Sequence, residues 1–187
     1  MPRGTGFEAL GPQAAKPVPP QDVEDLARRL GTIVTGNTAI VCVGSDLRGD
    51  DAAGVEIARR LSGTVPWPVY DTRNAPENFL TKIAAHKPQT VLLVDALHFD
   101  AEPGRVRLFR PDELSSAGQG PSTHGPAPLA FLEMLNAAHP CSCVVLGIQP
   151  EHIDLDAALS PPVRRAIDIV VEAFQVLARR QNPAAQP

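Results

Sequence analysis

Four residues of this sequence have side chains suited to a metal site, although they are far apart along the chain. Asp50 and Asp51 stand side by side in a loop that follows an apolar run. Asp95 ends a second apolar run, and His124 lies in a loop rich in Gly and Pro. Two carboxylates and one imidazole form a hard-to-borderline ligand set that suits Ni, Zn, Fe or Mn. Three protein ligands would leave positions open for a substrate or a water.

Each of these residues also has an ordinary structural explanation. Asp50 or Asp51 would cap the helix that follows, because a carboxylate there meets free N–H groups and the positive end of the helix dipole. Asp95 would be satisfied by loop amides, and His124 would be a surface residue. His98 competes with His124 as a ligand because it lies three residues after Asp95. For the adjacent pair, we expect Asp50 to shape the start of the helix and Asp51 to bind the metal.

Two other kinds of site find no support in the motifs. The segment "GSDLRGDDAAG" lacks both the G-x-G-x-x-G spacing and the G-K-S/T ending of phosphate-binding loops, and two carboxylates would repel a phosphate. The chain has no G-x-S-x-G motif, and only Ser122 stands near His124 as a candidate nucleophile. Serine and cysteine protease chemistry is therefore not predicted.

The three cysteines are expected to be reduced core residues. Cys42 lies inside an apolar run, and Cys141 and Cys143 form a C-x-C at the start of another. If that segment is a strand, both side chains point to the same face. A redox or metal role is the alternative, but two core thiols in a reducing compartment are the preferred interpretation.

The apolar pattern alternates between strand-like and helix-like segments, which predicts an α/β fold. We expect a mostly parallel, twisted sheet of about five strands with helices on both faces, in three layers. In such sheets ligands bind beyond the carboxyl ends of the strands, where Asp51 and Asp95 would emerge together. The predicted strands cover residues 38–44, 67–72, 90–97, 104–111 and 143–150, with 104–111 at an edge or antiparallel because its polarity alternates. The predicted helices cover residues 50–63, 76–88, 127–140 and 161–180.

One domain over residues 21–180 accounts for nearly the whole chain. It would begin with a short helix at about residues 22–30, capped by Asp22 and stopped by Gly31. Residues 1–20, rich in Pro, Gly and Ala, and residues 181–187 are expected to be flexible tails.

Composition limits the partners. The chain has 187 residues, of which 43% are hydrophobic and 20% charged, with a formal net charge of −4. No basic cluster indicates nucleic acid, and no apolar run approaches the roughly 18 residues of a membrane span. The N-terminus lacks the apolar core of a signal peptide. We therefore expect a cytoplasmic monomer that binds neither nucleic acid nor membrane.

Several segments, in order, resemble the [NiFe]-hydrogenase maturation endopeptidases, and most of all the branch that processes the large subunit of hydrogenase 3, the formate-hydrogenlyase type. The resemblance covers about residues 38–178. It rests on "VCVGSDLRGDDAAG", "DTRNAPENF", "LLVDA", "PGRVRLFRPDEL", "STHGPAPLAFL" and "VLGIQP".

The resemblance implies an activity and a set of site residues. The activity is removal of a short C-terminal peptide from the hydrogenase large-subunit precursor after nickel has been inserted. The catalytic, metal-binding positions of the family fall on Asp51, Asp95 and His124, which favours His124 over His98. The nickel is implied to belong to the substrate, so the site need not hold metal tightly by itself.

Two residues depart from the family pattern. Ser45 stands where V-G-N has Asn, and Ala52 stands where "GDDG" has its last Gly. These departures motivate an alternative, a non-cleaving chaperone that checks nickel on the same fold. A generic α/β metallohydrolase with a tightly held zinc is a further alternative.

Overall fold

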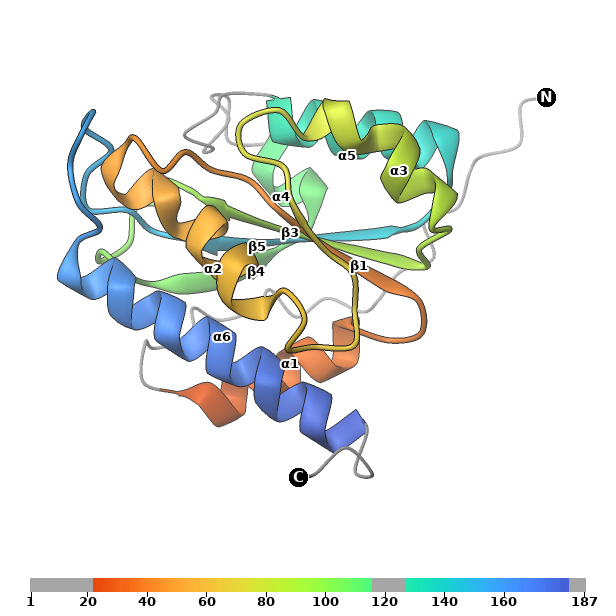
Figure 1. Ribbon diagram of the computed structural model, residues 1–187, viewed down its shortest axis with the longest axis horizontal. Helices are drawn as coiled ribbons and strands as arrows, with labels where there is room; N and C mark the ends of the chain where they lie inside the picture. The colour runs from red at the N-terminus through yellow and green to blue at the C-terminus, as the bar shows by residue number, and fades with distance from the viewer. Residues whose placement is uncertain (1–21, 116–126, 182–187) are drawn as a thin grey trace.

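The fold is a five-stranded sheet between two layers of helices (Figure 1). The computed structural model describes residues 22–115 and 127–181. The strand order is β2-β1-β3-β5-β4. The strands are β1 (Thr38–Cys42), β2 (Val69–Asp71), β3 (Thr90–Ala96), β4 (Val106–Phe109) and β5 (Ser142–Ile148). The α-helices are α1 (Val23–Ile33), α2 (Ala53–Leu61), α3 (Leu80–Ala85), α4 (Pro111–Ser115), α5 (Ala127–Ala138) and α6 (Pro161–Gln181), with 3-10 turns η1 (Gly49–Ala52) and η2 (Pro76–Phe79).

The strands pair as the apolar pattern predicts. β1, β2, β3 and β5 are parallel, and β4 runs antiparallel to β5 at the edge. Every residue of β1 and of β3 is buried, because helices cover both faces of these central strands. In β4 Val106 and Leu108 are buried and Arg107 is partly exposed, which explains the alternation seen in the sequence. The predicted mostly parallel α/β sheet is confirmed.

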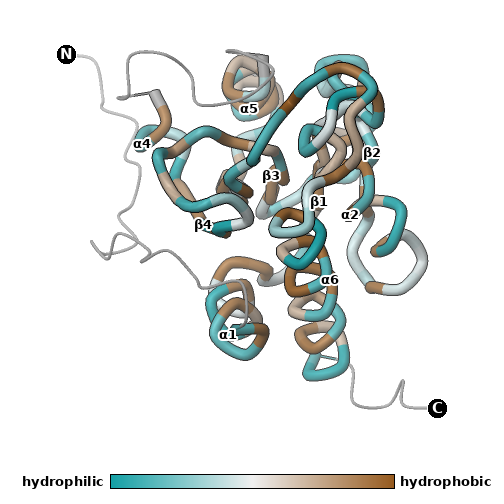
Figure 2. The backbone as a smooth tube through the Cα atoms, turned by 90° about the vertical axis from the view of Figure 1, so that its left-hand side faces the viewer, coloured by the Kyte–Doolittle hydropathy of each residue, from teal (hydrophilic) through white to brown (hydrophobic). Residues whose placement is uncertain are grey.

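Two apolar clusters, one on each face, hold the three layers together. Side chains of α1, α2 and α6 pack on one face, where Ile40, Leu92 and Phe174 are completely buried. Side chains of α3, α4 and α5 pack on the other face around Phe131 and Leu135. Figure 2 shows this division, with α4 and α5 on one side of the strands and α1 and α6 on the other. No helix within the described residues is both long and apolar enough to cross a membrane.

Two local predictions need correction. The Asp22 side chain caps α1, accepting from the Asp25 N–H at 2.8 Å, as predicted. Gly31 does not end α1, which continues to Ile33; Gly31 lies where a Cβ would be 3.3 Å from Leu177, so its small size suits packing on α6. The predicted strand 104–111 ends at Phe109, because Pro111 begins the short helix α4. The predicted tails lie outside the described residues, except that Gln181 still belongs to α6.

The crossing of α2 over β1 depends on Gly54. A Cβ at this position would lie 1.9 Å from the carbonyl oxygen of Val43, closer than any real contact. Because α2 follows directly after η1, this close packing also fixes the height at which η1 lies above the strand ends. Gly54 thus positions the loop that carries the candidate acids.

Replacing Gly54 should therefore destabilise the whole domain. We expect Gly54→Ala to lower the free energy of unfolding by about 3 kcal/mol, because the helix must move away from β1. Arg59→Ala, on the exposed side of the same helix, should change it by less than about 0.5 kcal/mol. Urea denaturation followed by circular dichroism measures both; equal stabilities would contradict the packing argument.

Candidate active site

Asp51 and Asp95 lie at the same edge of the sheet, at the carboxyl ends of β1 and β3. These strands are parallel, with Cys42 opposite Val94, and the Val43 N–H donates to the Val94 carbonyl at 2.9 Å. The turn η1, which contains Asp51, packs against β3, which contains Asp95. The side chains are only 2% and 0% exposed. Two carboxylates predicted from separate segments are thus placed at one edge.

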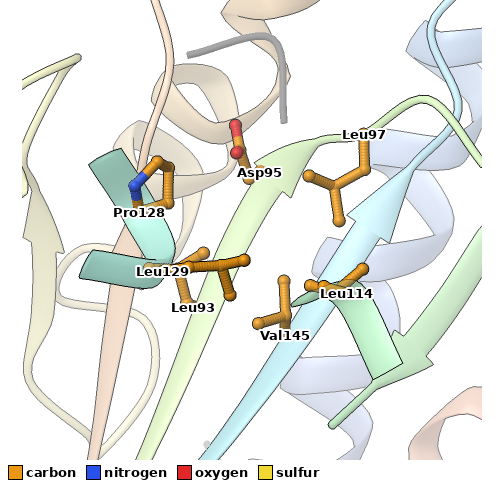
Figure 3. Close-up of a pocket in the computed structure, with 7 residues that line it drawn as sticks. All are labelled: Leu93, Asp95, Leu97, Leu114, Pro128, Leu129 and Val145. Atoms are coloured by element: carbon orange, nitrogen blue, oxygen red, sulfur yellow. The ribbon is translucent and has the colours of Figure 1, made fainter. Parts of the chain in front are cut away.

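Asp95 lies beside an apolar hollow on the α5 face of the sheet. Leu93 and Asp95 alternate along β3 and therefore share one face, and Leu97 directly follows the strand. Figure 3 shows the carboxylate next to the aliphatic side chains of this hollow. The other lining residues are Leu114, Pro128, Leu129 and Val145. Low-polarity surroundings strengthen the attraction of a carboxylate for a cation. The hollow therefore makes Asp95 suitable as a metal ligand.

The loop before Asp51 folds back on itself. The Ser45 N–H donates to the Asp51 carbonyl at 3.1 Å, and the Asp51 N–H donates to the Arg48 carbonyl at 3.0 Å. These two bonds hold the backbone of Asp51 at both of its polar groups. The backbone position of Asp51 is therefore set by the fold of the loop.

Asp50 has a different role from Asp51, but it does not shape the start of the helix by capping it, as predicted. Its buried carboxylate does not cap η1 or α2. It accepts four hydrogen bonds from the β5–α6 loop: the N–H groups of Glu151 and His152 at 2.8 and 3.2 Å, and the N–H and hydroxyl of Ser160 at 2.7 and 2.8 Å. Asp50 therefore ties its own loop to the segment that starts α6.

Residues of the β5–α6 loop are the part of the site that the sequence patterns did not predict. Ser160 directly precedes the Pro161 that opens α6, which is a helix-cap position and the only signal available. No sequence motif singles out His152. Its ring lies against Gly49, which has φ +52°, and a Cβ on Gly49 would be 2.7 Å from the His152 Nδ1. A side chain at position 49 would collide with this histidine.

Removing the Asp50 carboxylate should weaken the contact between the two loops. Asp50→Ala leaves buried N–H donors without an acceptor, so we expect the free energy of unfolding to fall by about 4 kcal/mol. Ser160→Ala removes one donor and should lower it by about 1–2 kcal/mol. Asp154→Ala, an exposed acid of the same loop, is the control and should be nearly neutral. Chemical denaturation gives all three values; an Asp50→Ala variant as stable as the control would refute the role.

Of the two candidate histidine ligands, only His98 lies within the described residues. His124 lies outside the described residues, so its role stays a prediction. His98 is exposed, with its Nδ1 3.4 Å from Nε2 of Gln149, whose Oε1 accepts from the Phe99 N–H at 2.8 Å. Within the described ranges, no group of three or more His, Cys, Asp or Glu side chains could hold a metal. The described residues supply the two carboxylates and no complete ligand set.

The two departures from the family pattern fit the loop. The Ser45 hydroxyl accepts from the Leu47 N–H at 3.4 Å, so this side chain bonds an amide of its own loop. Ala52 has φ −69° and ψ −6°, an ordinary helical conformation, because the helical turn has already begun at Gly49. Neither residue forces the loop out of shape.

The cysteines lie in two environments. Cys42 is completely buried, and burial, together with the charge of Asp71, raises the pKa of its thiol. Cys141 and Cys143 are only partly buried on the α5 side of the sheet, with their sulfurs 3.9 Å apart. The hydrogen bond from Cys143 lowers the pKa of Cys141, and the same bond and burial raise the pKa of Cys143. All three are free thiols.

The order of alkylation should follow these environments. Since the thiolate is the reactive form, iodoacetamide should modify Cys141 first, then Cys143, and Cys42 last. Cys143→Ala removes the hydrogen-bond donor and should slow alkylation of Cys141. Peptide mass spectrometry over time gives the order, and the unfolded protein is the control in which the differences should vanish. Early modification of Cys42 in the folded protein would contradict its burial.

Comparison with known proteins identifies the family to which this site belongs. The HycI family model, described as hydrogenase maturation protease, matches residues 55–176, well over half of the chain. The chain belongs to the hydrogenase maturation protease family. Asp95 and His124 fall inside the matched range, and Asp51 lies four residues before it. The predicted enzyme class, a hydrogenase maturation endopeptidase, is thereby confirmed.

Individual relatives support the same family. The hydrogenase 3 maturation protease of Escherichia coli K12 is 29% identical over 138 residues, covering 73% of this chain and 87% of that protein. The crystal structure of the [NiFe] hydrogenase maturation protease HycI from Thermococcus kodakarensis KOD1 is similar, with a TM-score of 0.69 and 32% identity, covering 80% of this chain and 98% of that chain. The crystal structure of the hydrogenase 3 maturation protease gives a TM-score of 0.67 at 26% identity, covering 75% and 90%.

Proposed function

We propose that this maturation protease removes the C-terminal extension of a [NiFe]-hydrogenase large-subunit precursor after nickel insertion, and that Asp51, Asp95 and His124 contact the substrate's nickel. The observation that carries the proposal is the burial of two carboxylates at one edge of the sheet in a member of this family. A buried carboxylate is costly unless it is paired, hydrogen-bonded or bound to a metal. Asp50 is committed to the β5–α6 loop by its hydrogen bonds, and Asp51 and Asp95 are the two acids that match the metal-binding positions of the family.

The ligand set fits a metal that arrives with the substrate. Asp51 and Asp95 offer hard oxygen ligands, and His124 would add a borderline nitrogen, a combination that accepts nickel. Three protein groups do not complete a coordination shell, so the remaining ligands would come from the precursor. Nickel held there would supply a Lewis acid that polarises the scissile carbonyl or a water. Asp51 and Asp95 orient the metal-bearing segment, and the fixed backbone of Asp51 keeps that orientation constant.

We also propose that the enzyme depends on nickel and acts as a monomer in the cytoplasm. Metal would not remain with the enzyme after the product leaves, because two or three protein ligands bind it weakly. Metal analysis of the purified protein tests this point directly. Stoichiometric zinc without the precursor would favour the generic metallohydrolase instead.

Loss of cleavage in ligand variants is the main test of the proposal. With nickel-loaded precursor, Asp51→Ala, Asp95→Ala and His124→Ala should each lower the cleavage rate by about a hundredfold or more, because the metal-bearing segment is no longer oriented. His98→Ala is the matched control and should cleave at nearly the wild-type rate. The change in precursor length on a denaturing gel is the measurement.

The controls separate this function from its alternatives. Nickel-free precursor should remain uncut by the wild-type protein. Wild-type-like cleavage by all three ligand variants would refute the assignment of the site. Binding of nickel-loaded precursor without any shortening would instead support the chaperone.

A further inference from the structure

Two exposed leucines lie on the loops next to Asp51. Among the described residues, three large hydrophobic side chains are strongly exposed: Leu155 at 70%, Leu47 at 59% and Met134 at 49%. Leu47 belongs to the loop that leads to Asp51, and Leu155 belongs to the β5–α6 loop. Met134 belongs to a different element, the helix α5. Both leucines are therefore at the carboxyl edge, where the candidate acids lie.

Backbone hydrogen bonds join the two loops that carry the leucines. The Asp156 N–H donates to the Leu47 carbonyl at 2.8 Å, so the residue that follows Leu155 is bonded directly to Leu47. The Gly49 N–H donates to the Ala157 carbonyl at 3.2 Å, and the Asp50 N–H donates to the His152 carbonyl at 3.0 Å. Together with the Asp50 carboxylate, these bonds make one unit of the two loops. The leucines are thus presented on an ordered surface.

Charged residues flank both members of the leucine pair, Leu47 and Leu155, along the chain. Asp46 and Arg48 flank Leu47, and Asp154 and Asp156 flank Leu155; all four are exposed. An apolar centre with a polar rim is the arrangement found at protein–protein interfaces. Exposed apolar groups on an ordered surface gain free energy when a partner removes them from water.

We propose that the leucine pair is the surface on which the large-subunit precursor docks. The inference rests on the proposed function, since that function names a folded protein as the substrate. Leu47 lies four residues before Asp51, and the Asp51 N–H donates to the Arg48 carbonyl, so the loop that presents Leu47 also holds the backbone of Asp51. A protein that places its metal-bearing segment at Asp51 must cover the neighbouring loop. An apolar patch on the precursor is the partner of matching chemistry.

The test compares a double variant with a matched control. Leu47→Ser combined with Leu155→Ser removes the apolar surface, and Met134→Ser removes the third exposed hydrophobic side chain, which belongs to α5. Circular dichroism should show that both unfold at nearly the wild-type temperature, since all three side chains are exposed. Calorimetric titration with nickel-loaded precursor gives Kd, and the cleavage assay gives kcat and KM.

The expected result is a loss of affinity confined to the double variant. Its Kd and KM should rise by about tenfold or more, while kcat at saturating precursor changes by less than about twofold. Met134→Ser should match the wild type in all three constants. Charge-neutral substitutions leave the charged rim intact, so the change reports the apolar contact.

Three results would overturn the docking surface. The first is a double-variant Kd within about twofold of the wild type. The second is a wild-type protein that does not bind the precursor at all. The third is a wild-type dimer, detected by light scattering, that the double variant loses, because the leucines would then pair two copies of this chain. Binding that depends on the leucines without cleavage would refute the proposed function and support the docking surface.

Discussion

The buried carboxylate of Asp50 is the interaction on which the carboxyl edge of the sheet depends. It gathers four donors from a loop about a hundred residues away in the sequence, and the loop can take its shape only while those donors are satisfied. A buried charge with a full set of donors is strongly held, whereas a partly satisfied one is costly. Asp50 performs this task, while the adjacent Asp51 is held through backbone hydrogen bonds to Ser45 and Arg48.

Much of the fold follows from local pattern. Strands β1 and β3 are buried on both faces, so their sequences are continuous apolar runs. The sequence of β4 alternates in polarity because only part of this strand is covered. Boundaries were less predictable where packing overrides local preference. Gly31 resembles a helix end but lies within α1 because the helix approaches α6 there, and Pro111 starts a helix so short that it has no periodicity.

The site was predictable to the extent that strand ends determine it. Asp51 and Asp95 follow from the rule that parallel strands present their carboxyl ends at one edge. The partners of Asp50 did not follow, because contacts between distant loops leave no periodic signal. Ser160 and His152 are close to Asp50 and Gly49 only through the path of the β5–α6 loop. Loops carry the specific chemistry of such folds, and their mutual contacts are the least visible in a sequence.

The hydrogen bonds between the two loops also affect the thermodynamics of association. A flexible loop must lose conformational freedom when a partner binds, and that loss reduces affinity. Here the β5–α6 loop is already fixed against the loop of Leu47 through both backbone and carboxylate contacts. The entropy of ordering is therefore lost during folding and not during binding. The edge acts as a preformed template, on which an encounter needs correct orientation but no rearrangement of these two loops.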